Sequence, residues 1–293
     1  MNNLKNLQLQ RKFKLLFNRL SQLEDLMIGN KEINYLDFDK KCIFVSGMPR
    51  SGTTILTHII SNFNDVGSFN YSDLPFTKIP FIWSKINWLY YFKNKSSERV
   101  HGDGLKINLL SPDAFEELIW SENLPNYENE NFSAILDSNY ENKELEKELV
   151  RSINKILLIR KKKIYLSKGN YNIFRIKYIN KILKNSLFLI CIRNPVDVIQ
   201  SSIRVHKKFL EIGEGNNKFT DEMNELCHFE FGKNRKDNFK NNFHKNEAKY
   251  YENQWLQMHK FILDDYAKLK NVFLVDFDKL VLNPEQSISN IAT

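Results

Sequence analysis

The chain has 293 residues, of which 42% are hydrophobic and 13% aromatic, enough to form the packed core of one large α/β domain or two small ones. Its formal net charge of +8 favours anionic partners. The lysines are spread among acidic residues, and no helix-turn-helix, zinc-finger or RNA-recognition motif is present, so we predict no nucleic-acid partner.

The three cysteines, Cys42, Cys191 and Cys227, lack paired spacing and predict neither a disulfide framework nor a zinc site, and we expect no metal. Residues 1–30 contain no apolar run of about 18 residues and no signal-peptide core. These features predict a reducing, cytoplasmic location without a transmembrane segment. Leucines and phenylalanines at helical spacing predict an N-terminal helical extension over residues 1–38, packed on the domain; a helix on a membrane surface is the alternative.

An apolar run beginning at Cys42 precedes a glycine-bounded loop, residues 47–54, and then a predicted helix. A strand, loop and helix start in this order gather backbone N–H groups and a positive helix end around one point, which suits a phosphate-like anion. The spacing of Gly47 and Gly52 matches the first part of a Walker A loop, but Thr53 stands where the lysine would be. The missing lysine therefore argues against a nucleotide kinase. A kinase whose loop departs from the Walker A pattern is kept as an alternative.

Two further apolar runs end in polar residues. The run from Ile164 ends at Lys168, and the run 187–192, typical of a central parallel strand, is followed directly by Arg193. Ser201 lies about two turns into the next predicted helix. An arginine fork and a hydroxyl together bind a dianionic phosphate. Two anion sites, each after a parallel strand, suit a nucleotide phosphorylated at both ends of its ribose. ATP would not require the second site.

The hexapeptide Pro-Arg-Ser-Gly-Thr-Thr at residues 49–54 resembles the 5′-phosphosulfate loop of sulfotransferases that use 3′-phosphoadenosine 5′-phosphosulfate (PAPS). The tyrosylprotein-sulfotransferase-like and bacterial branches are the most similar. The resemblance covers residues 40–75 and 164–205 strongly and residues 247–291 weakly. It implies a donor-binding set and a lysine that stabilises charge on the bridging oxygen as sulfate leaves. The donor-binding residues would be Arg50, Ser51, Gly52, Thr53, Thr54, Arg193 and Ser201, and the lysine would be Lys168.

In this family the general base follows the first helix and is a Glu or a His, but this chain has neither there. Asp73 is therefore the predicted proton acceptor, with a turn or capping role as its alternative. His101, on a glycine-containing turn, is the second candidate. Ser111 and Pro112 predict the start of a helix, and the polar segment 211–246 predicts a loop with little regular structure.

These observations predict one α/β domain over residues 1–293, of the P-loop type, with three layers, a mostly parallel central sheet and helical elaborations. The aromatic-rich segment 76–160 is the predicted helical insertion on the acceptor side. The predicted reaction moves a sulfuryl group from PAPS to an acceptor hydroxyl, with a carbohydrate as the first choice. A non-catalytic relative that binds nucleotides or glycans is the second alternative, because neither family base is present.

Overall fold

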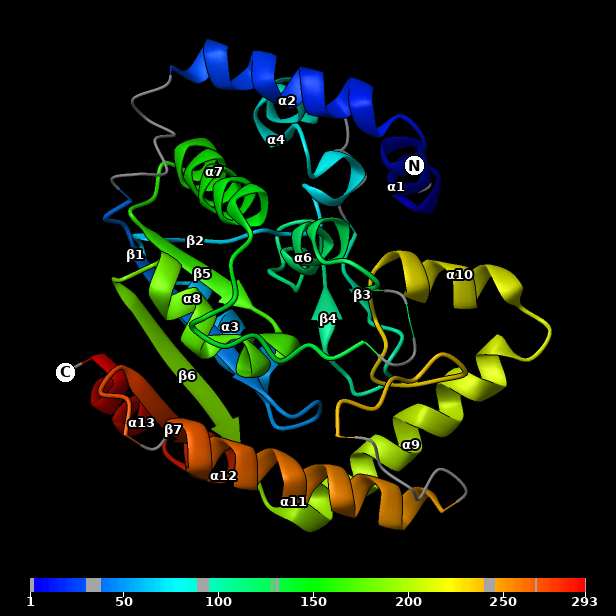
Figure 1. Cartoon of the computed structure of the whole chain (residues 1–293). Helices are drawn as coiled ribbons and strands as arrows, with labels where there is room; N and C mark the ends of the chain where they lie inside the picture. The colour runs from blue at the N-terminus through cyan, green and yellow to red at the C-terminus, as the bar shows by residue number, and fades with distance from the viewer. Residues whose placement is uncertain are drawn as a thin grey trace.

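The computed structural model describes residues 3–29, 38–88, 95–127, 129, 132–239, 246–266 and 268–292. Its centre is a parallel sheet with the strand order β2–β5–β1–β6–β7 (Figure 1). The strands are β1 Lys41–Gly47, β2 Val66–Gly67, β5 Ile164–Lys168, β6 Ser186–Ile192 and β7 Val272–Asp276. A separate antiparallel hairpin pairs β3 Ser97–Glu98 with β4 Lys106–Ile107.

Helices cover both faces of the sheet because successive strand residues point to opposite sides. Phe44 and Phe188 belong to the core on one face, whereas Val45 and Leu189, the next residues, belong to the core on the other. The first face is packed by α7 Lys143–Arg160, α8 Ile176–Ile182 and α11 Glu247–Tyr266. The second is packed by α3 Thr53–Ser61, α12 Phe277–Leu282 and α13 Pro284–Ala292. The predicted α/β fold with its mostly parallel central sheet is confirmed.

The parallel strands bring their carboxyl ends to one edge of the sheet. In the register, Val45 of β1 lies beside Lys168 of β5, and Gly47 lies beside Cys191 of β6. The loop after β1, the tip of β5 and the residues after β6 therefore meet at this edge, where open α/β sheets place their ligands.

The N-terminal extension forms two helices, α1 Asn3–Lys12 and α2 Lys14–Ile28, separated at Phe13. Among the described helices, none is both long enough and apolar enough to cross a bilayer. The cytoplasmic location and the division of the chain into a domain with two elaborations stay predictions.

Two local predictions were wrong. The helix predicted to start at Ser111 begins later, as α6 Glu117–Asn123, because Pro112 instead forms an isolated bridge with Asn70. The segment predicted as a polar loop is largely ordered. It contains the end of α9 Pro195–Gly213, then α10 Asn217–Glu225, and then a stretch with three buried side chains, those of Cys227, Phe229 and Phe231.

The other helical elements lie between α3 and α7 or directly after β5. They are η1 Leu74–Phe76, α4 Pro80–Ile86 and η2 Asn170–Phe174.

Candidate functional site

A cleft of about 670 Å³ lies at the carboxyl edge of the sheet. Its walls come from the loop between β1 and α3, the β3–β4 hairpin, the tip of β5, Arg193 after β6, and residues 226–231. Elements far apart in the sequence thus contribute to one site. Most of the predicted site residues line this cleft or contact a residue that does.

The loop between β1 and α3 has room for glycine alone at two positions. Gly52 has φ +99° at the N-cap of α3, and a Cβ there would lie 2.0 Å from Cδ2 of Phe277. A Cβ on Gly47, at φ +149°, would lie 2.7 Å from the carbonyl oxygen of Cys191. Ser51 is buried in this loop, and its Oγ has no hydrogen-bond partner among the described residues. A close backbone approach and an unpaired buried hydroxyl fit a loop that receives an anion.

The two predicted anion sites are in contact. Nε of Arg50 donates a hydrogen bond to Oγ of Ser201 on α9 at 3.0 Å, and Nη1 of Arg193 donates to the carbonyl oxygen of Arg50 at 3.3 Å. The Arg193 guanidinium also lies over the Phe277 ring at 4.9 Å, and its Nε is 3.8 Å from Asp278. The loop after β1 and the start of α9 therefore form one continuous basic surface.

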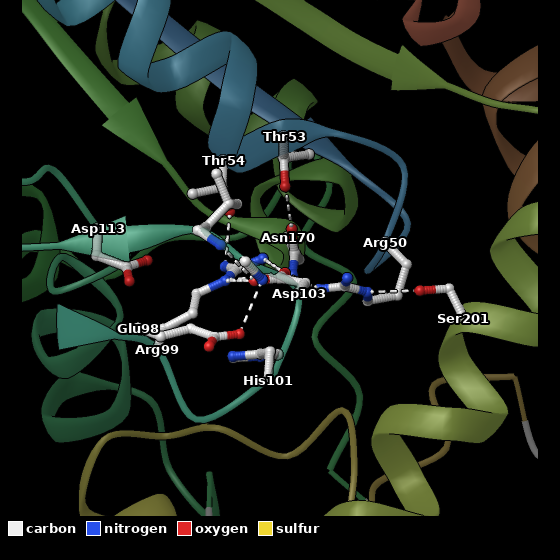
Figure 2. Close-up of polar contacts among 12 residues, drawn as sticks. Arg50, Thr53, Thr54, Glu98, Arg99, His101, Asp103, Asp113, Asn170 and Ser201 are labelled. Atoms are coloured by element: carbon white, nitrogen blue, oxygen red, sulfur yellow. Dashed lines mark hydrogen bonds and ion pairs between the residues drawn. The ribbon is translucent and has the colours of Figure 1, made fainter.

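The β3–β4 hairpin places a third arginine and a carboxylate on this surface. Nη1 of Arg99 donates to Oγ1 of Thr54 at 3.1 Å. Asp103 accepts hydrogen bonds from Arg99 and, at 2.9 Å, from Nη1 of Arg50. Burial raises the pKa of Asp103, but these hydrogen bonds and charges outweigh burial and hold the pKa well below its usual range. An ionised carboxylate thus occupies the two guanidinium groups beside the loop (Figure 2).

Lys168, at the tip of β5, is held by a half-buried acid that the sequence did not single out. Its Nζ donates to Oδ1 of Asp113 at 2.6 Å, and the Tyr71 hydroxyl donates to Oδ2 of the same carboxylate at 2.8 Å. Burial raises the pKa of Asp113, but the charge and hydrogen bond of Lys168 outweigh it, and the pKa stays well below its usual range. Asp113 is therefore ionised and fixes the lysine ammonium in the cleft.

A chain of polar contacts runs from the loop to two histidines. Oγ1 of Thr53 donates to Oδ1 of Asn170 at 3.3 Å, and Nδ2 of Asn170 donates to Oε1 of Glu230 at 3.1 Å. Nδ1 of His228 lies 3.0 Å from Oε2 of Glu230, and the Nε2 atoms of His228 and His101 are 3.2 Å apart. Burial is the main cause that lowers the pKa of His101 to about 2, and the nearby charges of Arg99 and Arg50 add to it. Both histidines and Glu230 line the cleft.

Asp73 is the predicted site residue that the structure does not bring to the cleft. Its side chain is buried, and both carboxylate oxygens accept from Nη2 of Arg160, at 2.7 and 2.6 Å. Oδ2 also accepts from the backbone N–H of Asn70 at 2.9 Å. Since Asp73 is enclosed by these partners and lines no part of the cleft, the prediction that it takes the acceptor's proton is corrected to a structural role.

Comparison with known proteins gives the chain a family. The sequence matches the model described as "Sulfotransferase family" over residues 42–293, and no curated protein matches it significantly. Among solved structures it is similar to sulfotransferase STF1 from Mycobacterium tuberculosis H37Rv, with 13% identity and a TM-score of 0.49 over 93% of this chain and 71% of that one. It is also similar to sulfotransferase STF9 from Mycobacterium avium, with 12% identity and a TM-score of 0.49 over 89% of this chain and 64% of that one.

The family match extends from β1 to the end of the chain and includes the loop, Lys168, Arg193 and both histidines. The chain therefore belongs to the sulfotransferase family.

Proposed function

We propose that the protein transfers a sulfuryl group from PAPS to a hydroxyl group of an acceptor, with a carbohydrate as the favoured acceptor class. One observation carries this proposal: the two anion sites predicted from separate parts of the sequence meet through Arg50, Ser201 and Arg193 at the wall of one cleft. A nucleotide with a 3′-phosphate and a 5′-phosphosulfate matches two adjoining anion sites. ATP has no group for the second of them.

In this proposal, two groups of residues bind the two ends of the donor. Arg50, Ser51, Gly52, Thr53 and Thr54 would bind the 5′-phosphosulfate at the N-terminus of α3, where the helix dipole favours an anion. Arg193 and Ser201 would bind the 3′-phosphate. The unpaired hydroxyl of Ser51 and the guanidinium of Arg50 support this assignment.

Lys168 is the proposed stabiliser of charge on the leaving oxygen. PAPS would supply a sulfuryl group attached to a phosphate leaving group, and displacement in line requires positioned reactants and a positive charge where the leaving oxygen becomes anionic. Lys168 fits this requirement because Asp113 holds its ammonium group at the carboxyl edge of the sheet, in the same cleft as the loop.

The histidine pair is the proposed proton acceptor in place of Asp73. The carboxylate of Glu230 favours a proton on Nδ1 of His228, so Nε2 of His228 accepts from Nε2 of His101. His101 then keeps an unprotonated Nδ1, which is buried in the cleft wall and has no partner among the described residues, as the proposed acceptor of the hydroxyl proton. Its low pKa keeps it neutral. An anionic donor beside Arg50 and Arg99 would offset their charge and raise the pKa of His101 toward a value suited to a general base.

Replacing Arg193 with alanine tests the 3′-phosphate site. We expect adenosine 3′,5′-bisphosphate to bind about 1.5–3 kcal/mol more weakly, because a charged hydrogen bond to phosphate is lost. Adenosine 5′-monophosphate, which lacks the 3′-phosphate, should bind the variant and the unchanged protein equally. Calorimetric titration measures both. Arg204→Ala, an exposed arginine on α9, is the matched control. Unchanged binding of the bisphosphate to the Arg193 variant would contradict the assignment of Arg193 to the 3′-phosphate.

Replacing Asp103 with asparagine tests whether its carboxylate competes with the donor. The carboxylate occupies Arg50 and Arg99, so its neutral counterpart should release both and tighten bisphosphate binding about tenfold. Glu98→Gln removes one negative charge from the same hairpin and the same cleft, but Glu98 accepts from the Gly104 N–H rather than from an arginine. If bisphosphate binding became equally tight in both variants, a general effect of charge would explain it. That result would contradict the proposal that the Asp103 carboxylate competes with the donor.

A further inference from the structure

Helix α2 exposes leucines on the outer side of the molecule. It lies across the outside of the fold, over α4 and α7 (Figure 1). Leu15 is 80% exposed and Leu26 is 67% exposed. Leu16, Leu23 and Met27 are each more than half exposed. A contiguous group of large apolar side chains on one helix is unusual on a free surface and marks a site of interaction.

The leucines of α2 face outward because three of its polar side chains, those of Ser21, Glu24 and Asp25, are turned toward the domain. Nζ of Lys155 on α7 lies 2.7 Å from Glu24 and 2.8 Å from Asp25, and it donates to Oγ of Ser21 at 2.9 Å. Nε of Arg151 lies 2.8 Å from Asp25. Ser21, Glu24 and Asp25 are all buried. These contacts fix the rotation of α2 about its axis, so its leucine face points away from the domain.

The outer face carries positive charge and no carboxylate. Within residues 3–29 the acidic residues are Glu24 and Asp25, and both are turned inward. Arg19 is exposed and lies four residues after Leu15 and four before Leu23, on the same stripe of the helix. Lys12, at the end of α1, is also exposed.

We infer that the leucine face of α2 binds the surface of an anionic lipid bilayer. Exposed leucines with arginine and lysine among them, on a helix that does not span a membrane, are the features of an interfacial helix: the leucines enter the acyl boundary and the cations meet the anionic headgroups. A second copy of this chain is the poorer occupant, because a symmetric pairing through this face would bring its exposed cations together without a carboxylate between them.

The test is sedimentation of the whole protein with lipid vesicles, without nucleotide. We expect binding to vesicles of phosphatidylcholine with phosphatidylglycerol and little binding to phosphatidylcholine alone. Leu15→Gln combined with Leu26→Gln should weaken binding by about tenfold or more. Arg19→Gln should weaken it by about fivefold, and on the anionic vesicles alone. These positions are exposed, so the variants should keep the circular dichroism spectrum of the unchanged protein.

Leu282→Gln is the control, because Leu282 is comparably exposed but lies on α12, on the second face of the sheet. An equal loss in this control would overturn the inference, and so would a failure of the unchanged protein to bind anionic vesicles. Light scattering tests whether a second copy of the chain binds this face instead. A dimer that the double leucine variant dissociates, with no vesicle binding, would assign the face to a second copy and contradict the lipid site.

Discussion

Replacing Lys168 with methionine is expected to lower turnover by about 100- to 1,000-fold, the usual effect of removing one group that stabilises developing charge. Binding of adenosine 3′,5′-bisphosphate should change much less, because Arg50, Arg193 and Ser201 hold its phosphates in our proposal. The two effects should differ because Lys168 lies at the tip of β5, and its described partner is Asp113 rather than one of the arginines that would bind the phosphates. Release of bisphosphate, with an acceptor on which the unchanged protein turns over, measures the first quantity, and calorimetry measures the second.

Two further variants sharpen this test. Lys106→Met removes an exposed lysine from the hairpin and should leave turnover unchanged. Asp113→Asn keeps the lysine but weakens the hydrogen bond that orients it, so a smaller loss of turnover is expected. A Lys168 variant that turns over normally would contradict the assignment. Equal losses of turnover and bisphosphate affinity would assign Lys168 to donor binding instead.

Replacing Lys155 with methionine is expected to lower the free energy of unfolding by about 3–5 kcal/mol, because it leaves the buried carboxylate of Glu24 without its cation. Asp25, by contrast, keeps Arg151. Lys155 is the buried partner of Glu24 and Asp25, and its side chain and that of Glu24 are at most 2% exposed. Burial raises the pKa of Glu24, and the charge of Lys155 opposes that shift. Urea denaturation measures the loss.

A triple variant supplies the control for this second prediction. Glu24→Gln and Asp25→Asn, combined with Lys155→Met, remove the uncompensated charges and should restore most of the lost stability. Lys147→Met, on the exposed side of the same helix, should cost less than about 1 kcal/mol. A Lys155 variant as stable as the unchanged protein would contradict the view that this cluster fixes α2 on the domain.

The sequence was sufficient to predict the sheet and the edge that carries the site. The runs that became β1, β5 and β6 are apolar because both faces of these strands are covered by helices. Parallel strands then require their carboxyl ends to share one edge, which brings the loop, Lys168 and Arg193 together. The contact between Arg50 and Ser201 follows from this topology.

Asp73 could not be placed from the sequence because a distant residue decides its environment. Arg160, which lies 87 positions away at the end of α7, binds its carboxylate and closes it off from the cleft. Local spacing contains no information on such a pairing. Asp113 was missed for the related reason that Ser111 and Pro112 were interpreted as a helix start.

Glu230 and His228 were missed although the sequence contains a signal for them. Cys227, Phe229 and Phe231 alternate with His228 and Glu230, a period of two that indicates an extended segment with one buried face. The surrounding asparagines and lysines led to the interpretation of a polar loop. In the structure the apolar residues are buried, and the two polar ones line the cleft.

In our proposal the cleft binds a nucleotide with phosphates at both ends of its ribose. Calorimetric titration with adenosine 3′,5′-bisphosphate and with ATP, both in EDTA, tests it most directly. We predict that the bisphosphate binds at least about tenfold more tightly, because only it fills both anion sites. A preference for ATP would contradict the donor site and favour a nucleotide kinase, and binding of neither nucleotide would contradict both.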